Sequence, residues 1–337
     1  MTLPRLLHLL HVAPFALVLA LALSSCQTTN FYAQAVSGQL EIFAKAEPVE
    51  SVIATTPDDT LRSQLQLTTR LLAFAEAHLD MPANGSFTRY ADLGRDHVVW
   101  VVHAAPELSL EPKRWWYPIV GCQAYRGFFS PEAASAETRR LHAKGYETWT
   151  SKVDAYSTLG YLRDPLLNTY IKRPEVDLAE LIFHELAHQK YYVSGHTDFN
   201  EAMAEAVCRE GVRKWLVHTG RPELVKRYDE RLRRISQALD AIQQCAAELE
   251  TVYQTDASPA DKRIRKAAAI ARLKSRLRTL SRNWGHEIGT WIGDTVNNPR
   301  INSFTTYEQD VPRFARLFDE CDGDFTLFWQ RVRQLKP

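Results

Sequence analysis

The sequence predicts a predominantly helical α+β fold in a chain of 337 residues. Apolar residues recur at helical spacing over long stretches, whereas only short segments are rich in β-branched and aromatic residues. The hydrophobic share of 45% and the charged share of 24% are ordinary for a globular protein, and the chain is long enough to bury a large core. The net charge of +1 argues against nucleic acid as a partner.

The N-terminus reads as a secretory signal peptide over residues 1–25. Arg5 precedes an apolar run over residues 6–23, and the run leads into Leu-Ser-Ser-Cys26. These four residues resemble a bacterial lipobox, in which the cysteine is lipidated and becomes the new N-terminus. We expect an exported protein that a lipid on Cys26 anchors to the cell envelope, on the periplasmic face of the outer membrane because Gln27 follows. A plain signal peptide or an uncleaved anchor is the alternative.

Residues 26–337 are expected to form a single domain. The expected elements before residue 160 are two helices within residues 30–80, strands over residues 97–103 and 117–121, a helix over residues 132–145 and a strand over residues 147–159. His97 and His103 on the first strand are more typical of edge or core positions than of metal ligands. Cys122, Cys208, Cys245 and Cys321 have no zinc-knuckle spacing, and they are either buried thiols or members of up to two disulfides.

The residues that carry chemistry begin with His184-Glu185-Leu-Ala-His188. Pro174 and Glu175 suit a first helical turn, so the stretch is expected to be helical. Two histidines four residues apart lie on one face of a helix, where both can bind one metal ion, usually zinc. Glu185 lies beside them as a candidate general base. The motif also occurs by chance, but the apolar flanks would bury these ionisable groups, which is costly without partners.

A second acidic cluster offers a third ligand. Gly195 marks a turn, with Thr197 or Asp198 as N-cap, and a second helix then covers residues 199–217. If the two helices pack antiparallel, Glu201 lies level with His188, and Glu205 lies one turn further, level with His184. We expect Glu201 to bind the metal and Glu205 to orient a histidine, although the reverse assignment stays open. Glu210 and His196 are weaker alternatives.

At these residues the sequence resembles a bacterial aminopeptidase family of zinc-dependent lipoproteins, and more broadly the gluzincins, metallopeptidases with two histidines and a downstream glutamate. The resemblance is carried by His184-Glu-Leu-Ala-His188-Gln189, by Phe199-Asn200-Glu201 and by Glu210-Gly-Val-Arg-Lys-Trp-Leu216. Further blocks lie at residues 116–129, 155–160, 164–167 and 297–307. Only twelve residues separate His188 from Glu201, fewer than in better-known gluzincins.

The resemblance implies a zincin-like core with an active-site helix, a short edge sheet and one Zn²⁺ per chain. It places Asn200 beside the ligands and Tyr307 near the site, where its phenol could donate a hydrogen bond to the oxyanion. In metallopeptidases with this helix an upstream edge strand commonly binds substrate backbone, which implies Tyr156, Ser157 and Gly160 as substrate-binding residues. An ordinary core strand is the alternative interpretation.

Residues 221–283 predict a long helical hairpin, with helices over residues 216–249 and 261–280. The second helix is crowded with Lys and Arg. A solvated hairpin whose charges pair with acidic residues of the first helix is favoured over a surface for nucleic acid or lipid headgroups. Asn297-Asn298-Pro299 is expected to be a turn.

The expected function is hydrolysis of peptide bonds by metal-activated water, with Glu185 as general base and a peptide or protein as substrate. Aminopeptidase and endopeptidase action are not separated, because no motif identifies an acidic group for a free amine. A cell-wall amidase would use the same residues. The alternative from another class is a non-catalytic scaffold or binding lipoprotein, whose metal site is vestigial or is structural and closed by His196 or Glu205 as a fourth ligand.

Overall fold

The computed structural model describes residues 33–117, 121–155, 162–284, 295–305 and 310–336. Helices predominate in these ranges and the strands form three small sheets, which confirms the α+β class. After a helix over residues 33–45, the described helices are α2 (Val49–Thr55), α3 (Asp59–Leu79), α4 (Pro131–His142), α5 (Asn168–Ile171), α6 (Glu175–Lys190), α7 (Thr197–His218), α8 (Glu223–Gln254), α9 (Pro259–Trp284), α11 (Asn298–Thr305), α12 (Val311–Asp319) and α13 (Phe325–Val332).

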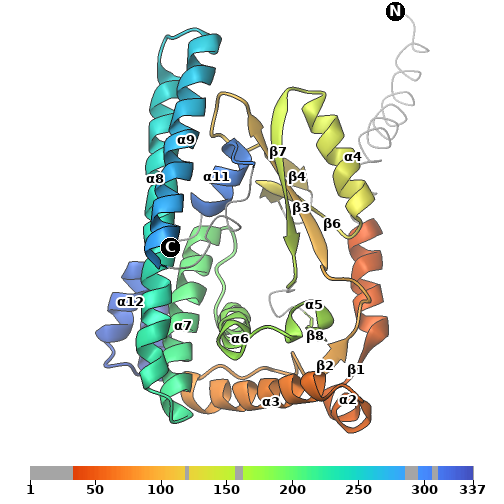
Figure 1. Ribbon diagram of the computed structural model, residues 1–337. Helices are drawn as coiled ribbons and strands as arrows, with labels where there is room; N and C mark the ends of the chain where they lie inside the picture. Colours follow the sequence, from red (N-terminus) through yellow and green to blue (C-terminus); the bar gives the residue numbers. More distant parts are fainter. Residues whose placement is uncertain (1–32, 118–120, 156–161, 285–294, 306–309, 337) are drawn as a thin grey trace, which may run out of the picture.

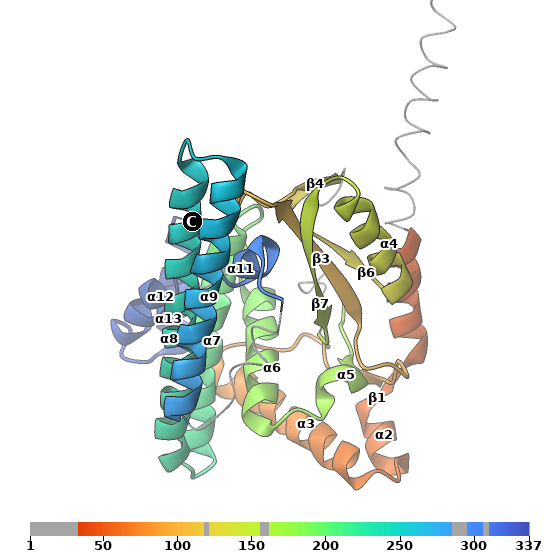
Figure 2. The same ribbon diagram turned by 45° about the horizontal axis from the view of Figure 1, so that its top comes forward.

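The central sheet has the strand order β6-β3-β7 and is antiparallel throughout. Its strands are β6 (Tyr125–Phe128), β3 (Val99–Pro106) and β7 (Tyr146–Val153). Helix α4 covers one face, where Val102 and Ala104 pack with Leu141 in a buried cluster. The other face turns toward α6, α7 and α11 (Figures 1 and 2). Within the described residues β7 pairs only with β3, so it is an edge strand of this sheet.

Two smaller sheets complete the strands. One has the order β1-β2-β8, and the other pairs β4 with β5. Their members are β1 (Ala46–Pro48), β2 (Arg89–Ala91), β8 (Leu166–Leu167), β4 (Trp115–Tyr117) and β5 (Gly121–Gln123). The parallel pairing of β2 with β8 brings the chain to α5 and then to the start of α6.

The largest hydrophobic core lies around α6 and α7, which pack along each other and on α3. Phe183 of α6 and Leu79 of α3 meet at Gly211 of α7, where a Cβ atom would lie 2.9 Å and 3.0 Å from their side chains. Only glycine therefore permits this close approach of three helices. Trp329 of α13 closes the same core and donates its indole N–H to the Leu79 carbonyl at 2.9 Å.

Helices α8 and α9 form a long hairpin that stands beside the central sheet (Figure 1). Ile242 and Leu249 of α8 pack against Leu273 and Leu277 of α9. The buried ammonium of Lys266 attaches the hairpin to the sheet through the Glu147 carboxylate, at 2.5 Å. Across the hairpin Arg272 pairs with Glu248, as the acidic residues of the first helix led us to expect.

Several element boundaries differ from the sequence-based expectations. The hairpin's first helix begins at Glu223 rather than at residue 216, because Gly220, at φ +72°, and Pro222 end α7 and redirect the chain. The strand expected over residues 147–159 ends at Val153. The expected turn at Asn297-Asn298-Pro299 is instead the start of α11, where proline suits the first helical turn.

No helix in the described part of the chain combines the length and the apolar character needed to cross a membrane. Cys122, Cys208, Cys245 and Cys321, all within the described ranges, are free thiols, and all except Cys122 are buried. The interpretation of these cysteines as unpaired thiols therefore holds in this structure.

Candidate metal centre

The site is built by α6, the turn that follows it and the first two turns of α7. Pro174 is the N-cap of α6, and the carboxylates of Glu175 and Asp177 lie in its first turn. The N-cap of α7 is His196 rather than Thr197 or Asp198, and it makes no side-chain capping hydrogen bond.

Asn200 fixes the turn between the two helices. Its fully buried amide accepts a hydrogen bond from the Val193 amide at 2.9 Å and donates one to the Val193 carbonyl at 2.8 Å. The structure therefore gives Asn200 a part in holding α7 against α6 rather than a contact with the histidines.

Three side chains converge where α6 and α7 cross. The Nε2 atoms of His184 and His188 lie 3.1 Å apart. The Glu201 carboxylate lies 3.3 Å from Nε2 of His184 and 3.6 Å from Nε2 of His188. His188 is buried, whereas His184 and Glu201 are half-buried, so the cluster has one open side.

These donors fit a zinc ion. Zinc bonds of about 2.0–2.1 Å in a tetrahedral site place neighbouring donor atoms about 3.3 Å apart, and the three separations here are close to that value. Two imidazoles and a carboxylate are also a donor set that catalytic zinc sites use. With three protein ligands such a site keeps a fourth position for water or substrate.

The electrostatics of the cluster favour a charged carboxylate. Burial opposes ionisation of Glu201, but hydrogen bonds from His184 and His188 prevail and lower the pKa of Glu201 to about 2. Burial also opposes the charged form of His184 and would by itself lower the pKa of this histidine. The hydrogen bond to Glu201 and the charges of Glu185 and Glu205 outweigh burial and raise the pKa above its usual value. Glu201 is therefore ionised near neutral pH.

A second group of possible donors shares His184 and adds Glu205 and Cys208. It fits a metal less well, because burial and the nearby Glu205 raise the pKa of the Cys208 thiol well above its usual value, and metal ions bind the thiolate. The Glu205 carboxylate lies 3.8 Å from Nδ1 of His184 and accepts a hydrogen bond from Nε of Arg209 at 2.7 Å. Glu205 thus lies behind the histidine, where a carboxylate orients the ring.

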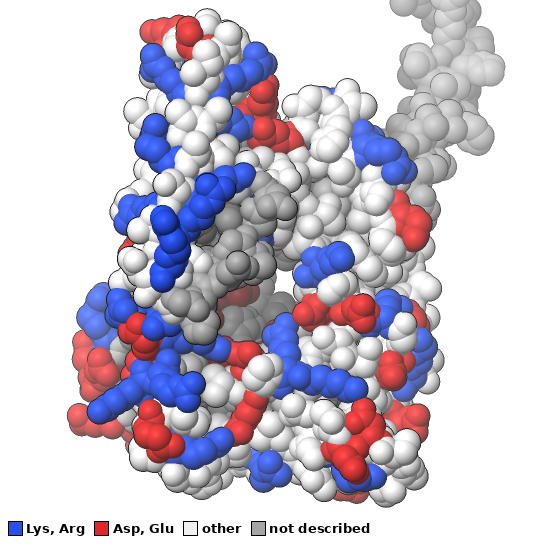
Figure 3. Space-filling model, in the orientation of Figure 1, with Lys and Arg blue, Asp and Glu red and all other residues white. Residues whose placement is uncertain are grey.

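Glu185 lines a cavity of about 520 Å³ together with His184, Glu205 and Cys208. The far side of the cavity is charged, with Asp177 and Glu180 both paired to Arg231. Figure 3 shows the face of the molecule hollowed between the helical hairpin and the central sheet. Glu185 and the candidate ligand His184 therefore line the same cavity.

Two tyrosines that the sequence analysis did not single out also lie at the site. The ring of Tyr192 lies 6.1 Å from that of His188. Tyr125 projects from β6 on the face of the central sheet opposite α4, which is the face that turns toward α6 and α7 (Figures 1 and 2). Tyr192 follows His188 by four residues, a spacing that could have indicated a shared face. Tyr125 falls within the block at residues 116–129 that carries the family resemblance, but no residue spacing linked it to the histidines.

The remaining sequence-based candidates are outside the described residues or take no part in the described cluster. Tyr307, Tyr156, Ser157, Gly160 and Cys26 fall outside the described residues. Among the described residues the possible metal-binding groups include neither exposed His196 nor Glu210, whose carboxylate pairs with Arg213. The strand expected from residue 97 begins at Val99, and His97 precedes it, with its ring 2.6 Å from the Asp154 carboxylate. His103 lies on β3 and packs against Trp149. Neither histidine belongs to a possible metal-binding group of the described residues.

Comparison with protein families matches residues 30–337 to the family described as "Putative aminopeptidase". No curated protein matches the chain, and no solved structure does. The match covers nearly the entire sequence, including both helices of the metal cluster and the strands that face it. The chain belongs to this aminopeptidase family.

Proposed function

We propose that this chain is a zinc-dependent aminopeptidase in which His184, His188 and Glu201 hold one Zn²⁺ and Glu185 is the general base. One observation carries the proposal: two imidazole nitrogens and a carboxylate lie 3.1–3.6 Å apart, beside a glutamate that opens on the same cavity. A zinc ion bound there supplies Lewis-acid chemistry, which lowers the pKa of water and polarises a carbonyl oxygen.

The chain's own residues supply the proton transfers. Glu185 accepts a proton from the attacking water and delivers it to the amine nitrogen that leaves, so the carboxylate is regenerated after each cycle. Glu205 keeps the ring of His184 oriented through its contact with Nδ1, at 3.8 Å. A phenol near the scissile carbonyl can donate a hydrogen bond to the oxyanion, and Tyr307 is our candidate for that donor.

Substrate backbone is proposed to bind along the outer edge of β7 beyond Thr148, whose carbonyl accepts a hydrogen bond from the Asn297 side chain at 2.9 Å, and onward to Tyr156, Ser157 and Gly160. This proposal is supported by the position of β7 at the border of the sheet, since an edge strand offers unpaired backbone groups to an extended peptide. We further propose export and a lipid anchor at Cys26, on the N-terminal pattern alone.

The test is metal content together with hydrolysis of short peptides by the protein from residue 27 onward. We expect about one zinc per chain, which His188→Ala abolishes and Glu185→Gln retains. Glu185→Gln should lose hydrolysis by at least about 100-fold, because general-base catalysis contributes roughly that much. Wild-type protein that takes up no zinc on titration would instead favour a scaffold lipoprotein that lacks the chemistry.

A further inference from the structure

Three aromatic side chains form a row across the central sheet, on the face opposite α4. His103 of β3 pairs in register with Tyr125 of β6 and with Trp149 of β7, so the three side chains project from the same face. The ring centroid of His103 lies 5.7 Å from that of Tyr125 and 5.2 Å from that of Trp149. The row spans three neighbouring strands, a width of about 10 Å.

The face of the sheet that carries the row turns toward α6 and α7, the two helices of the candidate metal centre (Figures 1 and 2). Tyr192, in the turn after α6, has its ring 6.1 Å from that of His188. Tyr125 is 41% exposed and Tyr192 is 38% exposed, although both rings are large and largely apolar. Both rings are therefore accessible to a ligand from solvent.

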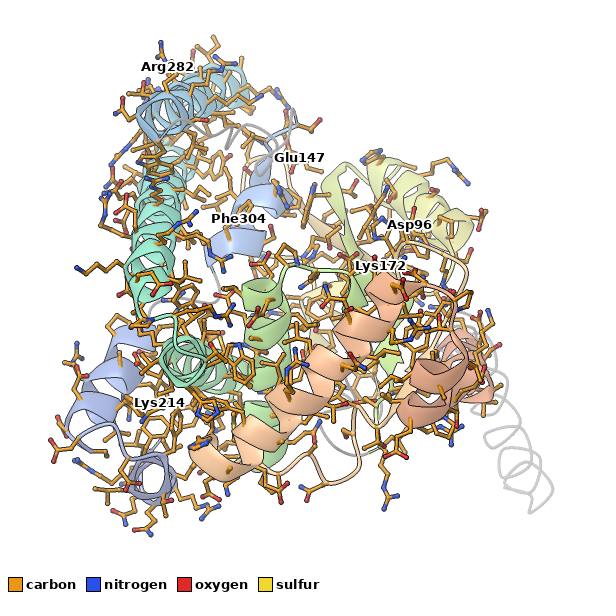
Figure 4. All side chains as sticks on the ribbon, turned by 60° about the horizontal axis from the view of Figure 1, so that its bottom comes forward. Asp96, Glu147, Lys172, Lys214, Arg282 and Phe304 are labelled. Carbon is orange, nitrogen blue, oxygen red and sulfur yellow. The ribbon has the colours of Figure 1, made fainter. Side chains whose placement is uncertain are left out.

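The opposite end of the row is held in place by α11. The guanidinium of Arg300 lies 3.9 Å from the centroid of Trp149 and 4.4 Å from that of Phe304. Figure 4 labels Phe304 on this helix, between the hairpin and the sheet. The indole is therefore fixed by cation–π stacking before any ligand arrives.

The imidazole at the centre of the row is neutral. Burial, and then the charge of Arg300, lower the pKa of His103 to about 4, so the imidazole is uncharged near neutral pH. The cavity that Glu185 lines is charged instead, because Arg173, Asp177 and Arg231 also line it. The two sides of the metal centre thus differ in chemistry.

We infer that the row of Tyr125, His103 and Trp149 is a specificity subsite for an aromatic side chain of the substrate, at a residue next to the scissile bond. This inference rests on the proposed peptidase function and names its substrate class. An aromatic side chain packs favourably on such rings, at Trp149 on the part of the indole that Arg300 leaves uncovered, whereas a charged one would lose hydration against the neutral imidazole. A lysine or arginine side chain would in addition meet the positive charge of Arg300.

The first experiment compares hydrolysis of Phe-Ala-Ala, Ala-Phe-Ala and Ala-Ala-Ala. We expect one of the two phenylalanine peptides to have a kcat/KM at least about 10-fold above that of trialanine, the lower end of the discrimination that apolar pockets achieve. Trp149→Ala and Tyr125→Ala should each bring this ratio to within about twofold of unity. Trp149→Phe and Tyr125→Phe, which keep a ring, should retain most of the ratio.

Trp116→Ala is the matched control, because Trp116 is a 69% exposed indole on the separate sheet of β4 and β5. Its removal should leave the ratio unchanged. A wild-type ratio near unity, or a ratio that survives both alanine substitutions, would overturn the inference while leaving the peptidase proposal intact.

Binding measurements distinguish the aromatic subsite from the proposed peptidase activity. Isothermal titration of Glu185→Gln protein with the three peptides should show the same preference in Kd, and Trp149→Ala in that background should remove it. If no peptide is hydrolysed by the wild type but the phenylalanine peptide binds about 10-fold more tightly through Trp149, the aromatic subsite stands and the peptidase proposal fails. Equal Kd values for all three peptides would rule out the subsite.

Discussion

The choice between Glu201 and Glu205 depends on which side of the His184 ring each carboxylate meets. Glu201 contacts Nε2 of both histidines, whereas Glu205 approaches only Nδ1 of His184 and is also engaged by Arg209. We therefore expect Glu201→Gln to lose stoichiometric zinc binding. Glu205→Gln should keep one zinc per chain with an affinity about 10- to 100-fold lower, the usual effect of removing a group that orients a ligand.

Zinc titration of both variants with a competing chromophoric chelator would measure this difference. Asp198→Asn is a suitable control, since this exposed carboxylate lies in the first turn of α7, ahead of Glu201. If Glu205→Gln rather than Glu201→Gln abolishes binding, the assignment of the two glutamates is reversed.

The acid sensitivity of the site should come from its histidines. The pKa of His184 is raised above 6.5, while that of Glu201 is lowered to about 2, so acidification protonates the imidazole long before the carboxylate. Protonation removes a ligand, and zinc affinity is therefore expected to begin falling at a pH above 6.5. In metal-free protein, folding stability is expected to depend on pH in the opposite direction. The His184–Glu201 pair stabilises the fold below the raised pKa of His184, and this stabilisation is lost as the pH rises through that pKa.

Zinc affinity measured at intervals from about pH 8 to about pH 5, in buffers that do not bind zinc, would test this expectation. A constant affinity down to pH 5.5 or so would show that His184 is not protonated in competition with the metal.

The crossing of α6 and α7 is the element on which the whole cluster depends, and Gly211 permits it. Gly211→Ala would gain about 1 kcal/mol in helix propensity, but its Cβ would lie 2.9 Å from Phe183 and 3.0 Å from Leu79. Overpacking of this kind costs about 1–3 kcal/mol, and here the clash involves two other helices, so we expect a net loss of stability. Urea unfolding would measure it.

A double-mutant cycle supplies the control for this prediction. Phe183→Leu shortens one of the two obstructing side chains, so the cost of Gly211→Ala should fall in that background. Additive effects of the two substitutions would mean that the close approach is not the cause of the destabilisation.

The helical hairpin and the central sheet are joined by a buried charge. Lys266 is 7% exposed and contacts both the Glu147 carboxylate, at 2.5 Å, and the Glu107 carbonyl, at 2.8 Å. Lys266→Ala leaves this half-buried carboxylate with one fewer donor, so the cost should lie between the about 1 kcal/mol or less of an exposed pair and the about 3–5 kcal/mol of a fully buried one. We expect a lower urea midpoint and earlier proteolytic cleavage of the hairpin.

Arg263→Ala is the matched control at the same interface. Arg263 forms an ion pair with Glu107 at 2.8 Å, but both side chains are exposed, so water takes over their contacts. Its removal should leave the urea midpoint almost unchanged. Equal sensitivity to the two substitutions would contradict the assignment of Lys266 as the buried attachment point.

Much of the architecture could be predicted from local sequence patterns. Helical spacing of apolar residues located α3, α6 and α7, and β-branched runs located β3, because each of these patterns reports which face of an element is buried. Local patterns did not fix where each helix begins and ends. The helix expected to begin at residue 216 is broken at Gly220 and Pro222, and the proline at residue 299 starts a helix instead of a turn.

The sequence by itself determined the family and placed two histidines and a glutamate on one helix, because a four-residue spacing sets which side chains share a helical face. Only the tertiary structure brought Glu201 to both histidines, since the packing of α6 against α7 depends on Gly211 and on the Asn200 turn. Only the sheet register could place Tyr125, His103 and Trp149 in one row facing the site. These residues are 22 to 46 positions apart, and no local pattern encodes which strands become neighbours.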